Sequence, residues 1–250
     1  MKKFAKVTVI TVISFAVIST ILFSSGVLDR FFMATAGDYV IHRSVCELTN
    51  RATDIIRGEV LSERVERRST LLPPRPESEN WYLAYQWYLE NRHEHYEIQT
   101  IHQLRVIDVF KGDAQVGDII EVAQLGGRIG LSRLTNDTKL HFAVGDDLIL
   151  FMTTFYASHG VQRPGTLLTP FQSVYRAAPS DQRVANELSA SIVEAFNDNP
   201  QLISIVFEPF SPYTDLTLTV GDLIQIRYES GLGPAPEDII SPPVRPPTRE

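Results

Sequence analysis

The 250-residue sequence has a single cysteine, Cys46, and fewer basic than acidic residues. One cysteine excludes an internal disulfide and any cysteine-rich zinc site. Lysine and arginine number 23 against 30 aspartates and glutamates, which gives a formal charge of −7. This net negative charge argues against a protein that binds the phosphate backbone of nucleic acids, so we expect no nucleic acid partner. We expect the thiol of Cys46 to be buried within a short helix at 43–51.

Signatures of catalysis and nucleotide binding are also missing. The sequence contains no Gly-x-Ser-x-Gly turn, no Gly-x-x-x-x-Gly-Lys loop and no Ser-x-x-Lys pair. The glycine-rich stretch at 126–130 has no helix expected behind it, and we interpret it as a bulge or loop. No residue pattern points to a cofactor or identifies an enzyme.

A long apolar run follows a basic N-terminus. Lys2, Lys3 and Lys6 precede Val7–Leu28, in which no side chain is charged. As a helix this run would extend about 33 Å, enough to cross a hydrocarbon core of about 30 Å. The lysines place the N-terminus in the cytoplasm, so a single-pass signal-anchor would hold residues 29–250 outside the cell membrane.

A cleaved signal peptide is the alternative interpretation of this segment. Ala34-Thr35-Ala36 has the small-x-small pattern of a cleavage site, although it lies beyond Asp29 and Arg30. In one case the membrane is a partner through residues 7–28, and in the other the protein is secreted. Both remain open at this point.

The remaining sequence is dominated by strand-like patterns. Apolar residues make up 44% of the chain, enough to bury a core. Four stretches are predicted to be strands: 54–61, 96–110, 119–125 and 148–152. We predict a mainly β fold, a small OB-like β-barrel with one or two peripheral helices, preceded by the N-terminal transmembrane or signal helix. Residues 64–80, rich in arginine and proline, are expected to form a loop.

The predicted organisation has five parts. They are a signal-anchor or signal peptide at 1–28, a linker at 29–42, a β-barrel domain at 43–178 with an insertion at about 64–95, a C-terminal helix and a short strand or helix at 179–228, and a Pro-rich tail at 229–250. An apolar stripe predicts a helix at 180–199, which Pro200 stops.

The tripeptide Val-Gly-Asp occurs at 116–118, 144–146 and 220–222. Glycine reaches positive φ and aspartate bonds to its own nearby backbone, so each site is typical of a tight turn. The first two turns are expected to lead into strands. The third is expected to lead into a strand or a short helix.

Several of these segments resemble a group of uncharacterised exported or membrane-anchored bacterial proteins with an OB-like β-barrel domain. They are Ala52–Val60, Tyr96–Thr100, Leu104–Asp113, Val116–Gly127 and Val144–Met152. The resemblance covers about residues 45–178 and rests on strands and turns. It therefore implies a fold and no catalytic residue.

Aromatic residues concentrate in one short stretch that includes both tryptophans of the chain. The candidate binding residues there are Trp81, Tyr85, Trp87 and Tyr88. Exposed aromatics concentrate binding energy, so this stretch is a binding platform, a helix that caps the barrel with its apolar face, or a contact with the membrane surface.

His93 and His95 are the nearest approach to a metal signature. In a strand they share one face, but His102 falls on the opposite face, so ligation by all three is geometrically awkward. We therefore keep His93 and His95 alone as candidate metal ligands, with a polar strand entry as the alternative.

These observations favour an extracytoplasmic, membrane-tethered binding or interaction module, with an unknown protein or glycan as its partner. A cell-envelope hydrolase or hydrolase accessory is the first alternative, because the aspartates include possible acid pairs. A structural envelope component is the second. An exposed aromatic face favours binding, whereas a pocket with two converging carboxylates favours catalysis.

Overall fold

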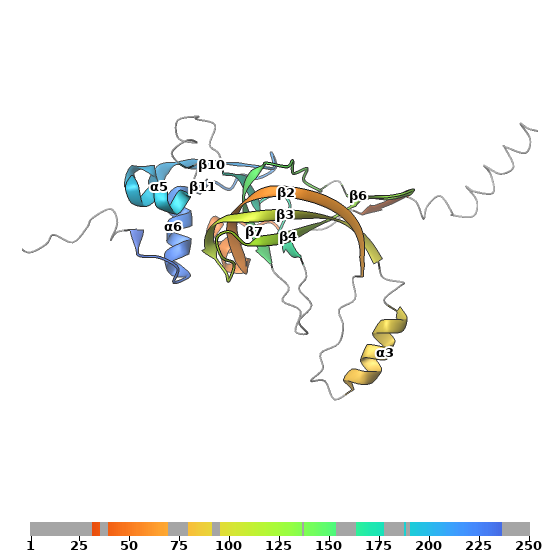
Figure 1. Cartoon of the computed structure of the whole chain (residues 1–250). Coiled ribbons are helices and arrows are strands. Elements are labelled where there is room, and N and C mark those ends of the chain that lie inside the picture. Colours follow the sequence, from red (N-terminus) through yellow and green to blue (C-terminus); the bar gives the residue numbers. More distant parts are fainter. Residues whose placement is uncertain are drawn as a thin grey trace, which may run out of the picture.

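A computed structural model describes residues 32–35, 40–69, 80–91, 96–136, 138–153, 164–177, 188 and 191–236. In this part of the chain the fold is mainly β (Figure 1). The elements in chain order are β1 (Phe32–Thr35), α2 (Val45–Arg51), β2 (Asp54–Ser69), α3 (Trp81–Asn91), β3 (Tyr96–Lys111), β4 (Ile119–Leu125), β5 (Gly127–Ile129), β6 (Ser132–Asn136), β7 (Asp147–Thr153), β8 (Gly165–Leu167), β9 (Val174–Arg176), α5 (Ile192–Asp198), the 3-10 helix η1 (Pro200–Ser204), β10 (Val206–Pro209), β11 (Leu218–Thr219) and α6 (Val220–Glu229).

The predicted membrane segment, residues 7–28, lies outside the described residues. Within the described ranges, no helix has both the length and the apolar character needed to cross a bilayer. The predicted Pro-rich tail at 229–250 is described only as far as residue 236.

The main sheet curls strongly but does not close into the predicted barrel. Its strand order is β11-β10-β9-β7-β2-β3-β4-β8, and a second sheet has the order β1-β6-β5. β8 bridges β4 and β7, but it forms only two residue pairs with each of them. A three-residue strand cannot seal the ladder along its length, and β9, β10 and β11 continue the sheet beyond β7. The expected closed β-barrel is therefore corrected to a curled, mainly β sheet.

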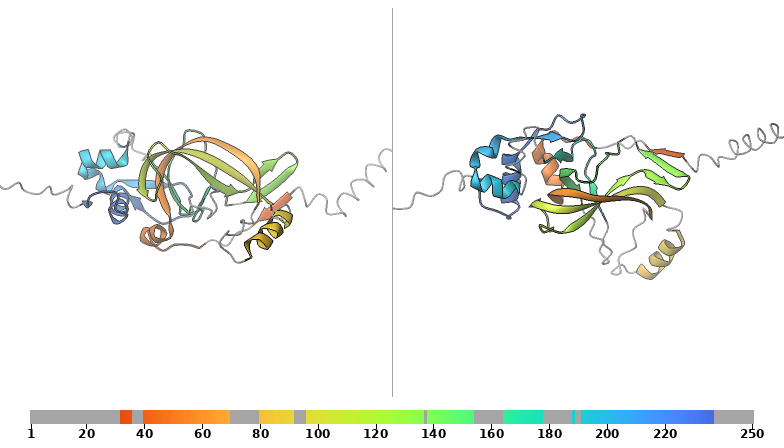
Figure 2. Two further views of the ribbon diagram at one scale, coloured as in Figure 1. Left: turned by 60° about the horizontal axis from the view of Figure 1, so that its bottom comes forward. Right: turned by 45° about the horizontal axis from the view of Figure 1, so that its top comes forward.

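The antiparallel pair formed by β2 and β3 is the longest feature of the fold, and it arches across the molecule (Figure 2). β2 continues through residues 64–69, so the loop predicted from residue 64 was wrong there. The charged residues of this stretch form pairs on the sheet: Arg64 contacts Glu121 of β4 at 2.8 Å, and Arg68 pairs with Glu66. The predicted strands at 96–110, 119–125 and 148–152 are confirmed to within one residue.

Two of the Val-Gly-Asp sites form matching turns, as predicted. Gly117 and Gly145 have φ of +92° and +91°. In each turn the aspartate carboxylate accepts a hydrogen bond from the backbone N–H three residues earlier, at 2.9 Å at 116–118 and 2.7 Å at 144–146. β4 and β7 follow these turns, so the sequence motif marks the start of two strands of the main sheet.

The third Val-Gly-Asp site begins a helix. Thr219 and Asp222 form a reciprocal capping box at the N-terminus of α6. A Cβ on Gly221 would lie 2.8 Å from the side chain of Ile203, so the missing side chain lets η1 approach α6 closely. Of the two outcomes left open by the sequence, the structure therefore has the short helix.

Only the second part of the helix predicted at 180–199 can be compared with the structure, because residues 180–187, 189 and 190 lie outside the described residues. Ser191 has an extended backbone (φ −154°, ψ 135°), and its hydroxyl accepts a hydrogen bond from the Glu194 N–H. It thereby acts as the N-cap of α5, which starts only at Ile192. Ser191 lies outside the helix, contrary to the prediction, because its hydroxyl satisfies one of the free amides in the first turn of α5.

Two apolar clusters form the core. One joins the sheet to α2, α5 and α6 and includes Leu48, Ile55, Phe110, Phe151, Tyr175, Phe196, Phe207 and Leu223. The other fills the inside of the curled sheet and includes Ile56, Val60, Leu104, Val106, Val122, Leu150 and Val174. The C-terminal helices therefore share one hydrophobic core with the sheet, at the end opposite β1 (Figure 1).

Gly145→Ala should lower the free energy of unfolding by about 1–2 kcal/mol, because φ is positive at this position. A Cβ there would have no atom within 4 Å, so the loss reflects backbone conformation alone. Urea denaturation measures it. Gly117→Ala in the matching turn should give a similar loss, and the exposed Val144→Ala is the control with little effect. Equal stability of all three variants would contradict this explanation.

Candidate functional site

The predicted aromatic platform is a helix that stands apart from the sheet. Trp81 begins α3, which Figure 1 shows away from the strands. Three side chains are more than half exposed: Tyr82 at 61%, Leu83 at 68% and Trp87 at 55%. Tyr85 stacks on Tyr88 with ring centroids 6.0 Å apart. The position of α3 away from the strands differs from the alternative in which α3 caps the sheet.

The structure does not test the predicted metal ligands, because His93 and His95 lie outside the described residues. Among the residues that are described, no three histidine, cysteine or acidic side chains are grouped to hold a metal ion. The thiol of Cys46 is exposed, which corrects the expectation that it is buried. It faces the Asn50 amide of the same helix at 3.7 Å.

His102 is fully buried on the inner face of β3, where its ring lies 4.8 Å from that of Phe142. The amide oxygen of Gln124 accepts a hydrogen bond from the Leu140 N–H, so its amide nitrogen is the group that faces His102, at 3.1 Å. That nitrogen is a donor, which makes Nε2 of His102 the acceptor and leaves the imidazole proton on Nδ1.

Nδ1 of His102 is buried and has no hydrogen-bond partner among the described residues. The Glu63 carboxylate lies 3.9 Å from it, directly across on β2. Burial lowers the pKa of His102 to about 4, against the opposing charge of Glu63 and with a contribution from Lys139 and His141. His102 is therefore neutral at neutral pH, as its contact with Gln124 requires.

Two buried glutamines hold distant backbone segments by the same device. Gln124 accepts from the Leu140 N–H at 2.8 Å and donates to its carbonyl at 3.2 Å. Gln172 accepts from the His42 N–H at 2.7 Å and donates to its carbonyl at 2.9 Å. Each side-chain amide makes one donated and one accepted backbone hydrogen bond, as a residue of a neighbouring strand would. Two connecting segments are thereby fixed in place on the sheet.

These clamped segments border two adjoining hollows that share Thr138. The first has a volume of about 230 Å³, and its polar lining residues include Glu97, Gln99, Gln124, Asn136, Lys139 and Thr166. The second has a volume of about 410 Å³, and its lining includes Ile41, Phe171, Gln172, Tyr213 and Asp215. Phe171 and Tyr213 meet edge to face, with ring centroids 5.8 Å apart. We refer to these two hollows together as the cleft; polar residues make up much of the lining of the first, and two aromatic rings line the second.

Lys139 is the cation of the polar hollow. Burial lowers its pKa, and the Glu63 carboxylate only partly opposes this effect. Among the described residues, no carboxylate lies within salt-bridge distance of its ammonium group. A ligand with a negative group would therefore supply the charge that this half-buried cation lacks.

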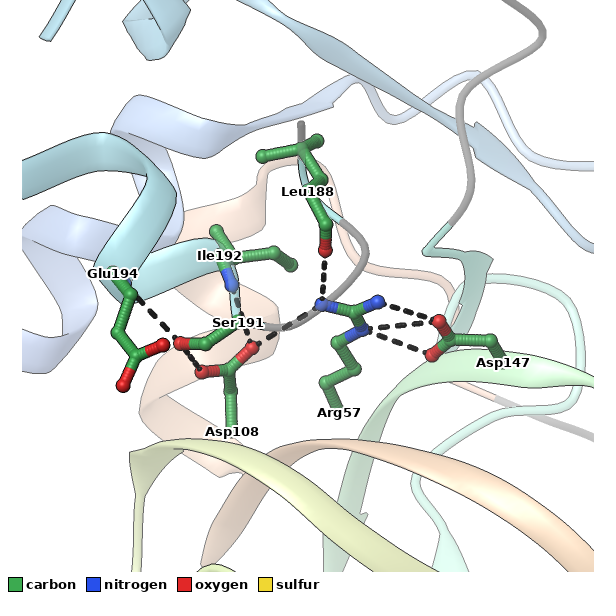
Figure 3. Close-up of polar contacts among 7 residues, drawn as sticks. All are labelled: Arg57, Asp108, Asp147, Leu188, Ser191, Ile192 and Glu194. Atoms are coloured by element: carbon green, nitrogen blue, oxygen red, sulfur yellow. Dashed lines mark hydrogen bonds and ion pairs between the residues drawn. The ribbon is translucent and has the colours of Figure 1, made fainter. Parts of the chain in front are cut away.

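Arg57 is the centre of a second buried polar cluster (Figure 3). Its guanidinium holds the Asp147 carboxylate with contacts of 2.6–3.2 Å and lies 3.5 Å from Asp108. It also donates to the Leu188 carbonyl at 2.8 Å. Burial alone would lower the pKa of Arg57, but the hydrogen bonds and charges of the two aspartates outweigh it and raise the pKa above its ordinary value.

Asp108 connects the cluster to α5. Its carboxylate accepts hydrogen bonds from the Ser191 hydroxyl and, at 2.8 Å, from the Ile192 N–H at the start of that helix. Both carboxylates that meet at Arg57 are thus occupied: Asp147 holds the guanidinium, and Asp108 joins the sheet to α5. We assign this cluster a structural role.

Arg57→Leu should lower the free energy of unfolding by about 3–5 kcal/mol, because it leaves the buried Asp108 carboxylate without its cation. Asp147 is partly exposed, so Asp147→Asn should cost less. Chemical denaturation compares the two variants. An Arg57→Leu protein as stable as the wild type would contradict the assigned role.

Acid should destabilise the fold through His102. The unfolded side chain takes up a proton near pH 6.5 and the folded one only near pH 4, so the unfolded state binds more protons between these values. Stability therefore falls as the pH falls, by about 3 kcal/mol between pH 7 and pH 4. His102→Gln should remove this part of the pH dependence of urea unfolding. His141→Gln, at an exposed position, should retain it, and equal profiles for wild type and His102→Gln would contradict the mechanism.

The cleft was not predicted from the sequence. Its lining comes from β3, β4, β6, β8 and four connecting segments, which lie far apart in the sequence. Lys139 is one of only two lysines after residue 6. This scarcity draws attention to Lys139 but does not show where its side chain lies. No protein-family model matches the chain, and no curated protein or solved structure is significantly similar to it.

Proposed function

We propose that this chain is a ligand-binding module, OB-like in its curled sheet, that residues 7–28 hold at the outer face of a membrane. The ligand occupies the cleft on both sides of Thr138. The observation that carries the proposal is the pair of adjoining hollows, one polar and one aromatic, with a single residue between them.

Preorganisation supports this role for the cleft. The segments at 138–140 and 40–42 are fixed by the side-chain amides of Gln124 and Gln172, both of which are buried. A site that is already ordered loses less conformational entropy when a ligand binds, so more of the contact energy appears as affinity. A few polar groups beside an apolar surface are typical of small-ligand sites.

The chemistry of the lining favours an organic anion with an apolar part. Lys139 would receive a carboxylate in the polar hollow, and the edge-to-face pair of Phe171 and Tyr213 would receive an aromatic or aliphatic group. The C-terminus of a short peptide combines both features. In an extended peptide, a residue two positions before the C-terminal one lies about 7 Å from it, so its large side chain would extend away from the carboxylate toward the aromatic hollow.

The test compares acetyl-Phe-Ala-Ala as the free acid with the same peptide as its C-terminal amide, bound to the full chain in detergent. The free acid should bind at least about tenfold more tightly, because a hydrogen bond to a charged group contributes about 1.5–3 kcal/mol. Lys139→Gln should remove this difference, whereas Phe171→Ala should weaken both peptides. Isothermal titration calorimetry measures the affinities.

Arg105→Gln is the matched control, because it removes a cation of β3 that pairs with Glu59 and does not line the cleft. It should leave both affinities unchanged. Equal binding of acid and amide would overturn the anion assignment. Binding of a neutral oligosaccharide at this cleft, with no binding of either peptide, would replace the peptide by a glycan as the ligand class.

A further inference from the structure

The end of the sheet that carries β1 lies close in sequence to the predicted membrane segment. That segment ends at Leu28, and β1 begins at Phe32 and pairs in parallel with β6. Four residues span at most about 14 Å in an extended chain. When residues 7–28 cross a bilayer, β1 and its partner strands are therefore held near the surface of that bilayer.

α3 lies at the same end of the molecule. Figure 1 and both views of Figure 2 place α3, β1 and β6 at one end of the sheet, with α5 and α6 at the other. Arg67, near the end of β2 that leads toward α3, donates a hydrogen bond to Ser132 of β6 at 2.8 Å. The exposed aromatic helix and the strand next to the predicted anchor are thus brought to one end by the fold.

The composition of α3 suits an interface between water and lipid. The helix contains no lysine or arginine, and Glu90 is its single charged residue. Leu83 and Trp87 are four residues apart, so they share one side of the helix, and they and Tyr82 are exposed. Tryptophan and tyrosine are enriched at membrane interfaces because an apolar ring body ends in one polar group.

The neighbouring hairpin offers positive charge. Arg128 of β5 and Arg133 of β6 lie directly opposite each other, and both are exposed. Like charges in facing positions of a sheet destabilise it. Within the described residues neither arginine has an acidic partner at salt-bridge distance. An anionic surface would offset this repulsion.

We propose that this end of the molecule rests on the surface of a lipid bilayer. The aromatic residues of α3 lie at the level of the headgroups, and Arg128 and Arg133 face anionic headgroups. The inference depends on the membrane tether of the proposed function and is independent of the ligand in the cleft.

The two tryptophans of the chain, Trp81 and Trp87, both belong to α3, so intrinsic tryptophan fluorescence reports on this helix alone. The full chain is reconstituted into phosphatidylcholine vesicles with and without phosphatidylglycerol, and compared with the chain in detergent. In anionic vesicles the emission should shift to shorter wavelength. Lipids brominated near the headgroup should quench it, and aqueous acrylamide should quench it less.

Arg128→Gln with Arg133→Gln should reduce this lipid contact in anionic vesicles at low salt, by up to about fivefold for each arginine removed. Arg105→Gln is the matched control, because that exposed arginine lies on β3 opposite Glu59 of β2 and outside the hairpin. It should leave the quenching unchanged. Neither substitution touches α3, so both variants keep the fluorescent probe.

Two failures are distinguishable by alkaline extraction of the vesicles. A chain that is washed off shows that the tether is absent, and the proposed membrane location fails. A chain that resists extraction, yet keeps water-like emission and full acrylamide quenching, overturns the contact of α3 with lipid. A blue shift that occurs only after a soluble protein is added would assign α3 to a protein partner and would also overturn it.

Discussion

The rest of the structure depends on the antiparallel pairing of β2 and β3. Along this one ribbon, residues 57 and 108 hold the buried ion cluster at one end, Glu63 faces His102 further along, and the last pairs lead to α3. Register shifts in β2 bend the ribbon, and the bend creates an inner face that apolar side chains fill. The three functional regions are therefore separated along a single curved pair of strands, each with its own chemistry.

Buried polar side chains act in this protein as connectors between segments far apart in sequence. Gln124 holds Leu140, Gln172 holds His42, and Arg57 reaches the Leu188 carbonyl. An unsatisfied buried polar group is costly, so each connection is strongly favoured once the sheet has formed. Nδ1 of His102 is one of three buried side-chain atoms without a hydrogen-bond partner among the described residues. Protonation of His102 acts against the fold because it charges a buried ring and places an N–H on Nε2, which faces the amide donor of Gln124.

Sequence patterns predicted the elements whose signals are local. Alternation located β3, β4 and β7, and the Val-Gly-Asp turns were recognisable because glycine and aspartate act within four residues. The extension of β2 through 64–69 was missed because charged residues there find partners on other strands, which no local pattern reveals. Ser191 was predicted to lie within a helix, although Ser191-x-x-Glu194 is the local pattern of an N-cap. The cleft has no local pattern, since its residues converge only after the sheet has curled.

The proposed tether and the proposed ligand site are connected through β6. This strand pairs with β1 along Arg133–Asn136, and its last residue, Asn136, also lines the polar hollow. The Asn136 side chain accepts hydrogen bonds from the Thr138 N–H and hydroxyl, so the residue shared by both hollows is fixed to the end of that strand. If the β1 end rests on a bilayer, the cleft is held at a constant height above it, because the connection contains hydrogen-bonded strand and turn. A ligand carried on a membrane-bound molecule would then meet the cleft in one orientation, which is the physical advantage of joining the two sites so directly.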